Sequence, residues 1–297
     1  MQLFSATVAS ESAYALAEGP LWDAPRERLL WVDIDAGSVH AGRLDGGTVV
    51  ADAALHFAET VAAVACADDG QLLVAGARDL YHVRAGSAPE LAARPIPAGR
   101  ASRLNDGACD PAGRFLIGTM ALDARRGEES LQRLEYDGSM TVIDDDLTLS
   151  NGLAWSPDGA VLYSVDTISG VIWARRYDPR TGACAERSAA VRCRGGGGSP
   201  DGVCSDTDGN LWVAVWGVGE VRCYSPAGER LATVTVPAPH TSSVAFAGPR
   251  RDVLVITTAR AQLSSAQLDA FPLSGHLFVA HVEAVGVAVA PWAGLAR

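Results

Sequence analysis

Short apolar runs alternate with tight turns along most of the chain. The runs are wholly apolar or alternate apolar and polar residues over the length of a β-strand, and they are rich in Val, Leu, Ile and Trp. The turns are rich in Asp, Pro and Gly, because Gly accepts a positive φ and Asp can hydrogen-bond the turn's own backbone. Six units of this kind are “WDAPRERLLWVDI” from Trp22, “ADDGQLLVAG” from Ala67, “DPAGRFLIGTM” from Asp110, “SPDGAVLYSVD” from Ser156, “DTDGNLWVAVW” from Asp206 and “GPRRDVLVITTA” from Gly248. Long helical patterns are absent, so the sequence predicts an all-β protein.

The turn-and-strand units recur at a nearly constant spacing. Their turns begin at Asp23, Asp68, Asp110, Ser156, Asp206 and Gly248, which gives intervals of 45, 42, 46, 50 and 42 residues. A period of about 40–50 residues with several short strands per unit is typical of β-propeller blades. We therefore predict a six-bladed β-propeller with four antiparallel strands per blade. Six units fill residues 1–297, so we expect one domain.

Two segments stand apart from the repeat. “GGGGS” at Gly195–Ser199 has the composition of a linker, but it falls within the approach to the fifth unit, so we expect a mobile loop inside the domain. “LFSATVA” near the N-terminus is predicted to supply a strand to the last blade, because this would close the ring and remove an exposed edge.

One position of the repeat carries mostly oxygen-bearing side chains. Five residues before each turn stand Glu18, Ala63, Asn105, Asn151, Asp201 and Ser243. In equivalent blades these residues would form one ring around the axis, at the entry to each innermost strand. A single such residue is commonly a turn cap or a solvated side chain. Four carboxylate or amide side chains at the same repeat position favour a rigid site for a hard cation.

The overall composition narrows the range of partners. The net charge of −11 disfavours nucleic acid and anionic membrane surfaces, because both require a basic face. No apolar run approaches the ~20 residues of a membrane helix, and the N-terminus lacks the pattern of a signal peptide. The six cysteines form no CxxC pair, which favours reduced thiols, and the histidines show no metal-binding spacing. We expect a cytoplasmic protein that is a monomer or a weak homo-oligomer.

Five motifs together resemble one known family. They are “AEGPLWDAPRERLLWVDI”, “RLNDGACDPAGRFLIGTM”, “SNGLAWSPDG”, “SPDGVCSDTDGNLWVAVW” and “HTSSVAFAG”, in this order from about Glu18 to near the C-terminus. The resemblance is to the senescence marker protein 30/gluconolactonase/regucalcin-like family. It implies a six-bladed propeller, a single divalent metal in the axial channel and hydrolysis of sugar lactones.

The same resemblance implies the ligands of the metal. They are Glu18 of “AEGP”, Asn151 of “SNGL” and Asp201 of “SPDG”, three of the ring positions selected above. All-oxygen ligation admits Ca, Mg and Mn and, with less preference, Zn or Fe(II). The metal would polarise the lactone carbonyl, and Asp201 is the expected general base. A bound cation lowers the pKa of a carboxylate, however, so a metal-activated hydroxide oriented by Asp201 is an equal alternative.

Substrate-binding residues are also implied by the motifs. Arg103 and Asn105 of “RLNDG” match substrate contacts of the family, with Asn105 close to the metal. Asp123, after “GTM”, stands where animal members carry a substrate-contacting glutamate, so the shorter acid implies a differently shaped pocket. Asp106 is expected to support its own turn. Trp216, at a strand end, is not assigned to the pocket.

Three other functions compete with a sugar lactonase. The first is a phosphotriesterase-like or aryl-ester hydrolase on the same architecture, against which the “RLND” motif favours sugar lactones. The second is a regucalcin-like calcium-binding protein that holds the metal for structure or regulation. The third is an interaction propeller without enzymatic activity, which would need no acid or amide at the axis.

Overall fold

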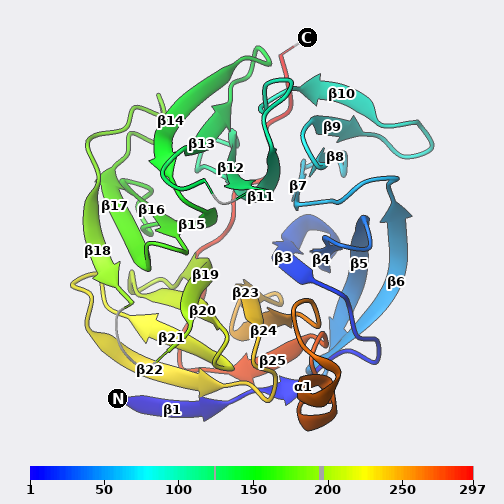
Figure 1. Cartoon of the computed structure of the whole chain (residues 1–297), viewed down its shortest axis with the longest axis vertical. Helices are drawn as coiled ribbons and strands as arrows, with labels where there is room; N and C mark the ends of the chain where they lie inside the picture. Colours follow the sequence, from blue (N-terminus) through cyan, green and yellow to red (C-terminus); the bar gives the residue numbers. More distant parts are fainter. Residues whose placement is uncertain (124, 194–196, 297) are drawn as a thin grey trace.

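The structure is a computed structural model, and it describes residues 1–123, 125–193 and 197–296. Its strands form six sheets arranged around a central axis (Figure 1). Each sheet contains four strands in antiparallel order, and one sheet gains a fifth strand from the N-terminus. The prediction of an all-β, six-bladed β-propeller with four antiparallel strands per blade is therefore confirmed.

The blades are numbered in chain order, and the first strand named for each lies nearest the axis. Blade 1 consists of β3 (Ala17–Asp23), β4 (Arg28–Asp33), β5 (Ser38–Asp45) and β6 (Thr48–His56). Blade 2 consists of β7 (Ala63–Cys66), β8 (Leu72–Ala75), β9 (Leu80–Val83) and β10 (Glu90–Ala93). Blade 3 consists of β11 (Ser102–Cys109), β12 (Phe115–Ala121), β13 (Glu129–Leu134) and β14 (Met140–Leu147).

Blade 4 consists of β15 (Ser150–Trp155), β16 (Val161–Asp166), β17 (Val171–Arg176) and β18 (Ser188–Arg192). Blade 5 consists of β19 (Ser199–Ser205), β20 (Leu211–Trp216), β21 (Glu220–Tyr224), β22 (Arg230–Thr235) and the additional β1 (Gln2–Ser5). Blade 6 consists of β23 (Thr241–Ala247), β24 (Val253–Thr258), β25 (Phe278–His281) and β2 (Thr7–Val8). The described residues also form two short helices, η1 (Ala24–Arg26) and α1 (Ser265–Ala270).

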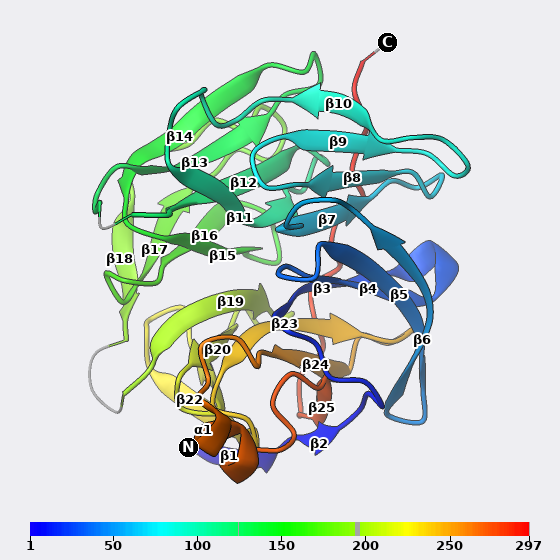
Figure 2. The same ribbon diagram turned by 45° about the vertical axis from the view of Figure 1, so that its right-hand side comes forward.

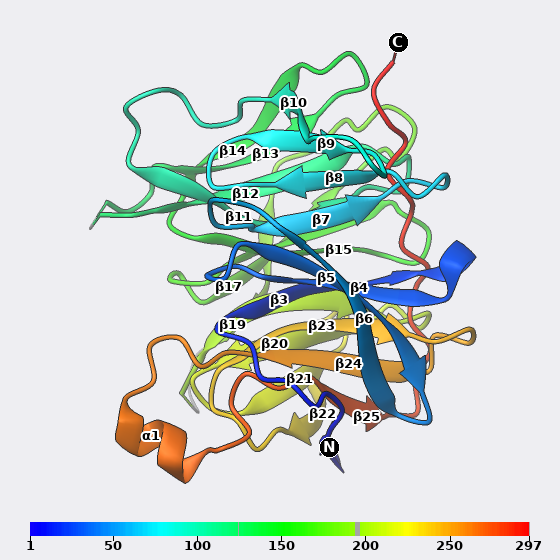
Figure 3. The same cartoon turned by 90° about the vertical axis from the view of Figure 1, so that its right-hand side faces the viewer.

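The ring has two different faces. We call the face at which the innermost strands begin the entry face, and the face at which they end, at the six repeat turns, the turn face. η1 lies in the first of these turns, whereas α1 lies on the entry face between β24 and β25 (Figure 3). Of the helices in the described part of the chain, none has the length and apolar character needed to span a membrane.

The N-terminal segment closes the ring. β2 pairs antiparallel with β25 through Thr7 and Val279, so the chain start completes the last blade as predicted. β1 pairs in parallel with β22, with Gln2 opposite Ala232, and so extends blade 5 as well. The predicted segment is therefore divided between two blades, because Ala6 leaves one sheet before Thr7 enters the next. Both pairings cover backbone edges that would otherwise be exposed.

Apolar side chains fill the space between neighbouring blades. Between blades 2 and 3, for example, Leu73 and Leu80 pack with Leu104, Phe115 and Ile117, and all five are fully buried. Complete burial of such a side chain contributes about 1.5–3 kcal/mol. The alternating pattern of the strands thus produces one apolar layer between each pair of sheets. The six cysteines are free thiols, of which three are buried and three are half-buried.

The glycine run leads directly into blade 5. Gly195 and Gly196 lie outside the described residues, so the predicted mobility of this loop is not tested. Gly198 has a φ of 75°, and a Cβ on it would lie 2.7 Å from a methyl carbon of Val215. A larger residue would therefore not fit at this point. Ser199 follows at once as the first residue of β19.

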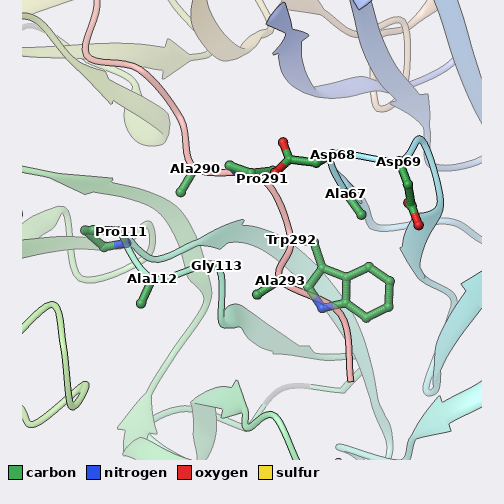
Figure 4. A pocket seen from close by; sticks show the side chains of 10 residues that line it. All are labelled: Ala67, Asp68, Asp69, Pro111, Ala112, Gly113, Ala290, Pro291, Trp292 and Ala293. Carbon is green, nitrogen blue, oxygen red and sulfur yellow. The ribbon is translucent and has the colours of Figure 1, made fainter. Parts of the chain in front are cut away.

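The C-terminal segment, residues 285–296, crosses the turn face (Figures 2 and 3). At one end, Val287 N donates a hydrogen bond to the Ser205 carbonyl of blade 5 at 3.0 Å. At the other, Trp292 N donates to Cys66 O at 2.8 Å, and its indole is buried between blades 2 and 3. Figure 4 shows Trp292 beside the turns of these blades. The segment therefore ties opposite sides of the ring together, which the repeat pattern did not predict.

Candidate metal centre

The ring positions coincide with irregularities in the innermost strands. In five of the six blades, the pairing of the innermost strand with the second strand shifts register. The shifts lie between Glu18 and Leu21, Leu104 and Gly107, Asn151 and Leu153, Pro200 and Val203, and Thr241 and Ser243. A β-bulge interrupts the regular alternation of side chains and directs them differently. Blade 2 has a regular register and carries an alanine, Ala63, at this position.

Four polar side chains of the ring are buried at the entry end of the channel. Glu18 and Asn105 are each 7% exposed, and Asn151 and Asp201 are each 5% exposed. Asn151 Nδ2 donates hydrogen bonds to Asp201 Oδ1 in the next blade and to Thr167 Oγ1 at 3.0 Å. The structure therefore joins two of the three predicted metal ligands by a direct hydrogen bond.

The third predicted ligand, Glu18, lies within electrostatic reach of the others. Its Oε2 accepts a hydrogen bond from Gly19 N at 2.9 Å. Burial, followed by the charges of Asp201 and Asp106, raises the pKa of Glu18 well above its usual value. Burial and Asp106 likewise raise the pKa of Asp201, against the opposing effects of Asn151 and Arg103. Clustered buried carboxylates of this kind are costly unless a cation or a proton neutralises them.

The Asn151 carboxamide leaves one buried acceptor without a partner. Its Oδ1 atom is inaccessible to solvent and receives no hydrogen bond from the described residues. Such an oxygen is normally satisfied, because an unpaired buried acceptor loses its hydration without compensation. An oxygen-preferring cation beside the Glu18 and Asp201 carboxylates would satisfy it and neutralise both charges. The residues present therefore fit a divalent cation.

The composition of this donor set is unusual in one respect. The described residues contain no cluster of three or more His, Cys, Asp or Glu that could hold a metal ion. The set formed by Glu18, Asn151 and Asp201 differs in kind, because its third donor is an amide. Amide oxygens are ordinary ligands of hard cations, so two acids and one amide remain a suitable donor set.

Arg103 and Asn105 lie next to the candidate ligands. Arg103 Nη1 donates to Asn105 Oδ1 at 2.9 Å and to Leu104 O at 2.8 Å. Asn105 Nδ2 donates to Ser150 O at 3.0 Å, next to Asn151 in blade 4. Burial lowers the pKa of Arg103, whereas nearby carboxylates, including Glu18, oppose this effect. Arg103 thus places positive charge beside the acidic ring.

Asp123 lies outside this group. It follows β12, and its carboxylate is 46% exposed. Its Oδ1 accepts hydrogen bonds from Arg125 Nε at 2.8 Å and from Arg125 N at 3.1 Å. These bonds from Arg125 lower the pKa of Asp123 and direct its carboxylate to a neighbour in the same loop. A role of Asp123 in substrate binding stays a prediction.

Asp106 has a position that the sequence reasoning did not foresee. It was expected to support its own turn, but its Oδ1 accepts a hydrogen bond from Gly107 N at 2.7 Å within β11, before the turn begins. Burial also raises the pKa of Asp106 to about 6, and its charge acts on both Glu18 and Asp201. The sequence feature that could have identified Asp106 as part of the site is its position directly after Asn105 on an innermost strand. Asp106 thus extends the acidic cluster toward the turn face.

A cavity of about 560 Å³ occupies the channel below the metal centre. Asp106 lies on its wall with apolar residues such as Leu153, Val203 and Phe246. Residues 287–291 of the C-terminal segment line its end at the turn face. A second pocket, of about 420 Å³, lies beside Trp292 (Figure 4) and includes none of the ring residues. Its position on the turn face separates it from the metal centre.

Comparison with known proteins places this architecture in a family. Residues 16–260 match the family model described as SMP-30/Gluconolactonase/LRE-like region. Pentonolactonase XacC of Haloferax volcanii is 35% identical over 250 residues, covering 84% of this chain and 83% of that protein. The 6-deoxy-6-sulfogluconolactonase of Pseudomonas putida is 34% identical over 282 residues, covering 94% of this chain and 95% of that protein.

Solved structures agree with this assignment. The crystal structure of a calcium-binding protein, regucalcin, from Agrobacterium tumefaciens has a TM-score of 0.89 and 28% sequence identity. The similarity covers 100% of this chain and 98% of that one. The match thus includes all six blades and the C-terminal segment. Together, the family match, these relatives and the ring of buried oxygen donors show that the chain belongs to the SMP-30/gluconolactonase/LRE-like family.

Proposed function

We propose that the protein is a metal-dependent sugar lactonase that hydrolyses aldonolactones of the gluconolactone or pentonolactone type to aldonic acids. The observation that carries this proposal is that Asn151, whose buried Oδ1 has no partner among the described residues, hydrogen-bonds Asp201, whose charge in turn acts on the buried Glu18 carboxylate. Relatives at 34% and 35% identity are named as lactonases, which supports the same class of reaction.

Glu18, Asn151 and Asp201 would hold one divalent cation. When bound, the cation supplies a Lewis acid that polarises the lactone carbonyl. The all-oxygen set suits Ca, Mg or Mn and, with less preference, Zn or Fe(II). Two anionic ligands balance a divalent charge, so a neutral lactone can approach without a large electrostatic penalty.

Asp201 is the proposed base or orienting group for the attacking water. Its carboxylate accepts the water proton while the water oxygen forms the new bond to the carbonyl carbon. The bond between the carbonyl carbon and the ring oxygen then breaks, and the ring oxygen takes up the proton that Asp201 had accepted, which gives the open hydroxy acid and restores the carboxylate. The hydrogen bond from Asn151 Nδ2 holds one Asp201 oxygen in position, so the direction of the carboxylate is set before substrate binds.

Arg103 and Asn105 are the proposed substrate contacts of the centre. A guanidinium and a carboxamide beside the ring offer donors and an acceptor to sugar hydroxyls. A site built to hydrogen-bond hydroxyls discriminates strongly against analogues that lack them. Asp123, on its more exposed loop, would contact the distal part of the sugar. Because the C-terminal segment lines the turn-face end of the cavity, we assign substrate entry to the entry face.

A pH-indicator assay tests the proposal. Gluconolactone, galactonolactone and pentonolactones are compared with phenyl acetate and a phosphotriester, with and without EDTA. We expect lactone turnover that EDTA abolishes and added cation restores. Asp201→Ala should lose this turnover, whereas Asp208→Ala, in an exposed turn, should retain it. Equal lactone turnover by both variants would refute the assigned role, and turnover of the other esters alone would indicate the related hydrolase class.

A calcium-binding protein without turnover is the second candidate. It is supported by the similarity, over the whole chain, to a structure described as a calcium-binding regucalcin. Isothermal titration with Ca²⁺ and Mg²⁺ separates the two possibilities. Cation binding that depends on Asp201, without hydrolysis of any lactone in the panel, would favour binding over catalysis.

A further inference from the structure

A stacked aromatic pair stands at the entry face beside the metal centre. Trp216 is the last residue of β20, and His240 directly precedes β23. Their ring centroids lie 4.0 Å apart, and their planes are inclined by 17°. Trp216 pairs with Ser199, two positions before Asp201, and His240 lies three positions before the ring residue Ser243. The pair therefore joins blades 5 and 6 next to two ring positions.

The backbone holds this pair rigidly. Trp216 and His240 form an isolated antiparallel bridge. The nitrogens of Gly217 and Gly219 each donate to Pro239 O at 2.9 Å, which ties the β20–β21 turn to the residue before His240. His240 Nδ1 lies 3.0 Å from Ala261 O. Because a carbonyl can only accept, Nδ1 carries the proton, and the imidazole is fixed in one orientation.

The Trp216 side chain remains partly accessible to solvent. His240 is buried, at 9% exposure, whereas Trp216 is half-buried. Trp212 precedes Trp216 on the same side of β20 and packs edge-on against Phe246 of blade 6, with ring centroids 6.0 Å apart. Because the imidazole covers one face of the Trp216 indole, the exposed part of Trp216 belongs to the rest of the side chain. Trp216 thus continues the apolar layer of blades 5 and 6 to the channel mouth.

The polar and aromatic residues belong to blades on different sides of the ring. Arg103 and Asn105 belong to blade 3, which faces blade 6 across the axis of a six-bladed ring (Figure 1). A molecule that spans the entry face would meet the hydrogen-bonding groups of blade 3 and, across the ring, the Trp216–His240 pair at the junction of blades 5 and 6. Small-molecule sites commonly combine an apolar or aromatic wall with a few polar groups that set orientation.

We propose that Trp216, supported by His240, is a platform that binds the C–H face of the sugar lactone ring. This inference rests on the proposed function, since it concerns the substrate of the same centre. A lactone ring presents hydroxyls at its edge and C–H groups on its faces, and an aromatic face offers an apolar, weakly negative surface to such groups. Arg103 and Asn105 hold the hydroxyl edge, while Trp216 sets the tilt of the ring.

Kinetics with a matched tryptophan control test the platform. Trp216→Ala should raise the KM for gluconolactone about tenfold with kcat nearly unchanged, because it removes a contact made equally in the ground and transition states. Trp216→Phe should restore most of the affinity. Trp173→Ala is the control, since Trp173 is also half-buried but lies on β17 beneath Arg187, 4.7 Å from its guanidinium. This control should keep the KM of the unaltered protein.

An equilibrium probe separates the platform from the reaction. The cyclic polyol 1,5-anhydroglucitol keeps the ring and hydroxyls but has no carbonyl to hydrolyse. Its dissociation constant, measured by calorimetry, should rise in Trp216→Ala by the same factor as the KM, while Ca²⁺ affinity stays unchanged. Equal polyol affinity in Trp216→Ala and the unaltered protein would overturn the platform. Polyol binding that depends on Trp216, in a protein without lactone turnover, would retain the platform and reject the lactonase.

Discussion

Asn151 Nδ2 donates a hydrogen bond to Asp201 Oδ1, although 50 positions separate the two residues in the chain. The bond crosses from blade 4 to blade 5 at the entry end of the channel. Among the described residues no donor reaches Asn151 Oδ1, and the charge of Asp201 acts on the buried Glu18 carboxylate. The same amide therefore restrains the proposed base and offers an oxygen to a cation.

Replacing Asn151 with alanine should weaken cation binding by at least about tenfold, since even outer-shell partners of metal ligands contribute this much. Calorimetric titration of the metal-free protein with Ca²⁺ measures the change. Thr167→Ala provides a comparison, because it removes the second hydrogen bond of Asn151 but no proposed ligand. An equal loss of cation affinity in the two variants would indicate that the contribution of Asn151 comes from its hydrogen-bonded orientation and not from ligation of the cation.

The metal-free protein should lose stability as the pH rises above the usual pKa of its buried acids. Burial raises the folded-state pKa values of Glu18, Asp201 and Asp106, the last to about 6. Their protonated forms are favoured in the folded state, so this stability is present at low pH and is lost as the pH rises through the raised values. Saturating Ca²⁺ should suppress this loss.

Thermal unfolding from pH 4 to pH 8, with EDTA or with Ca²⁺, measures this dependence. Asp106→Asn is the informative variant, because it removes one of the charges that raise the pKa values of Glu18 and Asp201. Its metal-free Tm should fall less with pH than that of the unaltered protein. A metal-free Tm that rises steadily across the range would contradict the assigned pKa shifts.

Replacing Trp292 with alanine should destabilise the protein by about 3–5 kcal/mol, the usual cost of truncating a buried aromatic residue. Trp292 is 3% exposed and anchors the C-terminal segment between blades 2 and 3. Denaturant unfolding measures the change. Val289→Ala, in the same segment but 52% exposed, should change stability by less than about 0.5 kcal/mol. Similar effects of the two substitutions would show that the segment is not anchored by its indole.

Replacing Gly152 with alanine should disturb the metal centre without removing a ligand. A Cβ on Gly152 would lie 2.5 Å from Asp201 O and 2.6 Å from Val203 N. Blades 4 and 5 would have to separate, at a cost of about 1–3 kcal/mol. Cation affinity should fall together with stability, which calorimetry and denaturant unfolding can follow in one variant. Unchanged cation affinity would mean that the Asp201 backbone can shift without moving its carboxylate.

The sequence by itself determined the fold and the positions of the ring. The turns at Asp110, Ser156 and Asp206 repeat the same local chemistry, and the runs after them alternate with strand period. These signals are local, so they can be read without knowledge of contacts. Because the blades are equivalent, the offset from each turn also placed Asn151 and Asp201 at the same depth, where the structure joins them.

Only the tertiary structure decided which non-repeating residues meet. Asp106 joins the acidic cluster, Asp123 is held by Arg125, and Trp292 docks between blades 2 and 3. The stacking of Trp216 on His240 likewise depends on the packing of blade 5 against blade 6. These contacts give no periodic signal in the sequence. Each joins residues that have no counterpart in the other blades, and each depends on how neighbouring sheets pack. A repeat reports what the blades share, whereas the contacts that distinguish one blade from another arise when the ring closes.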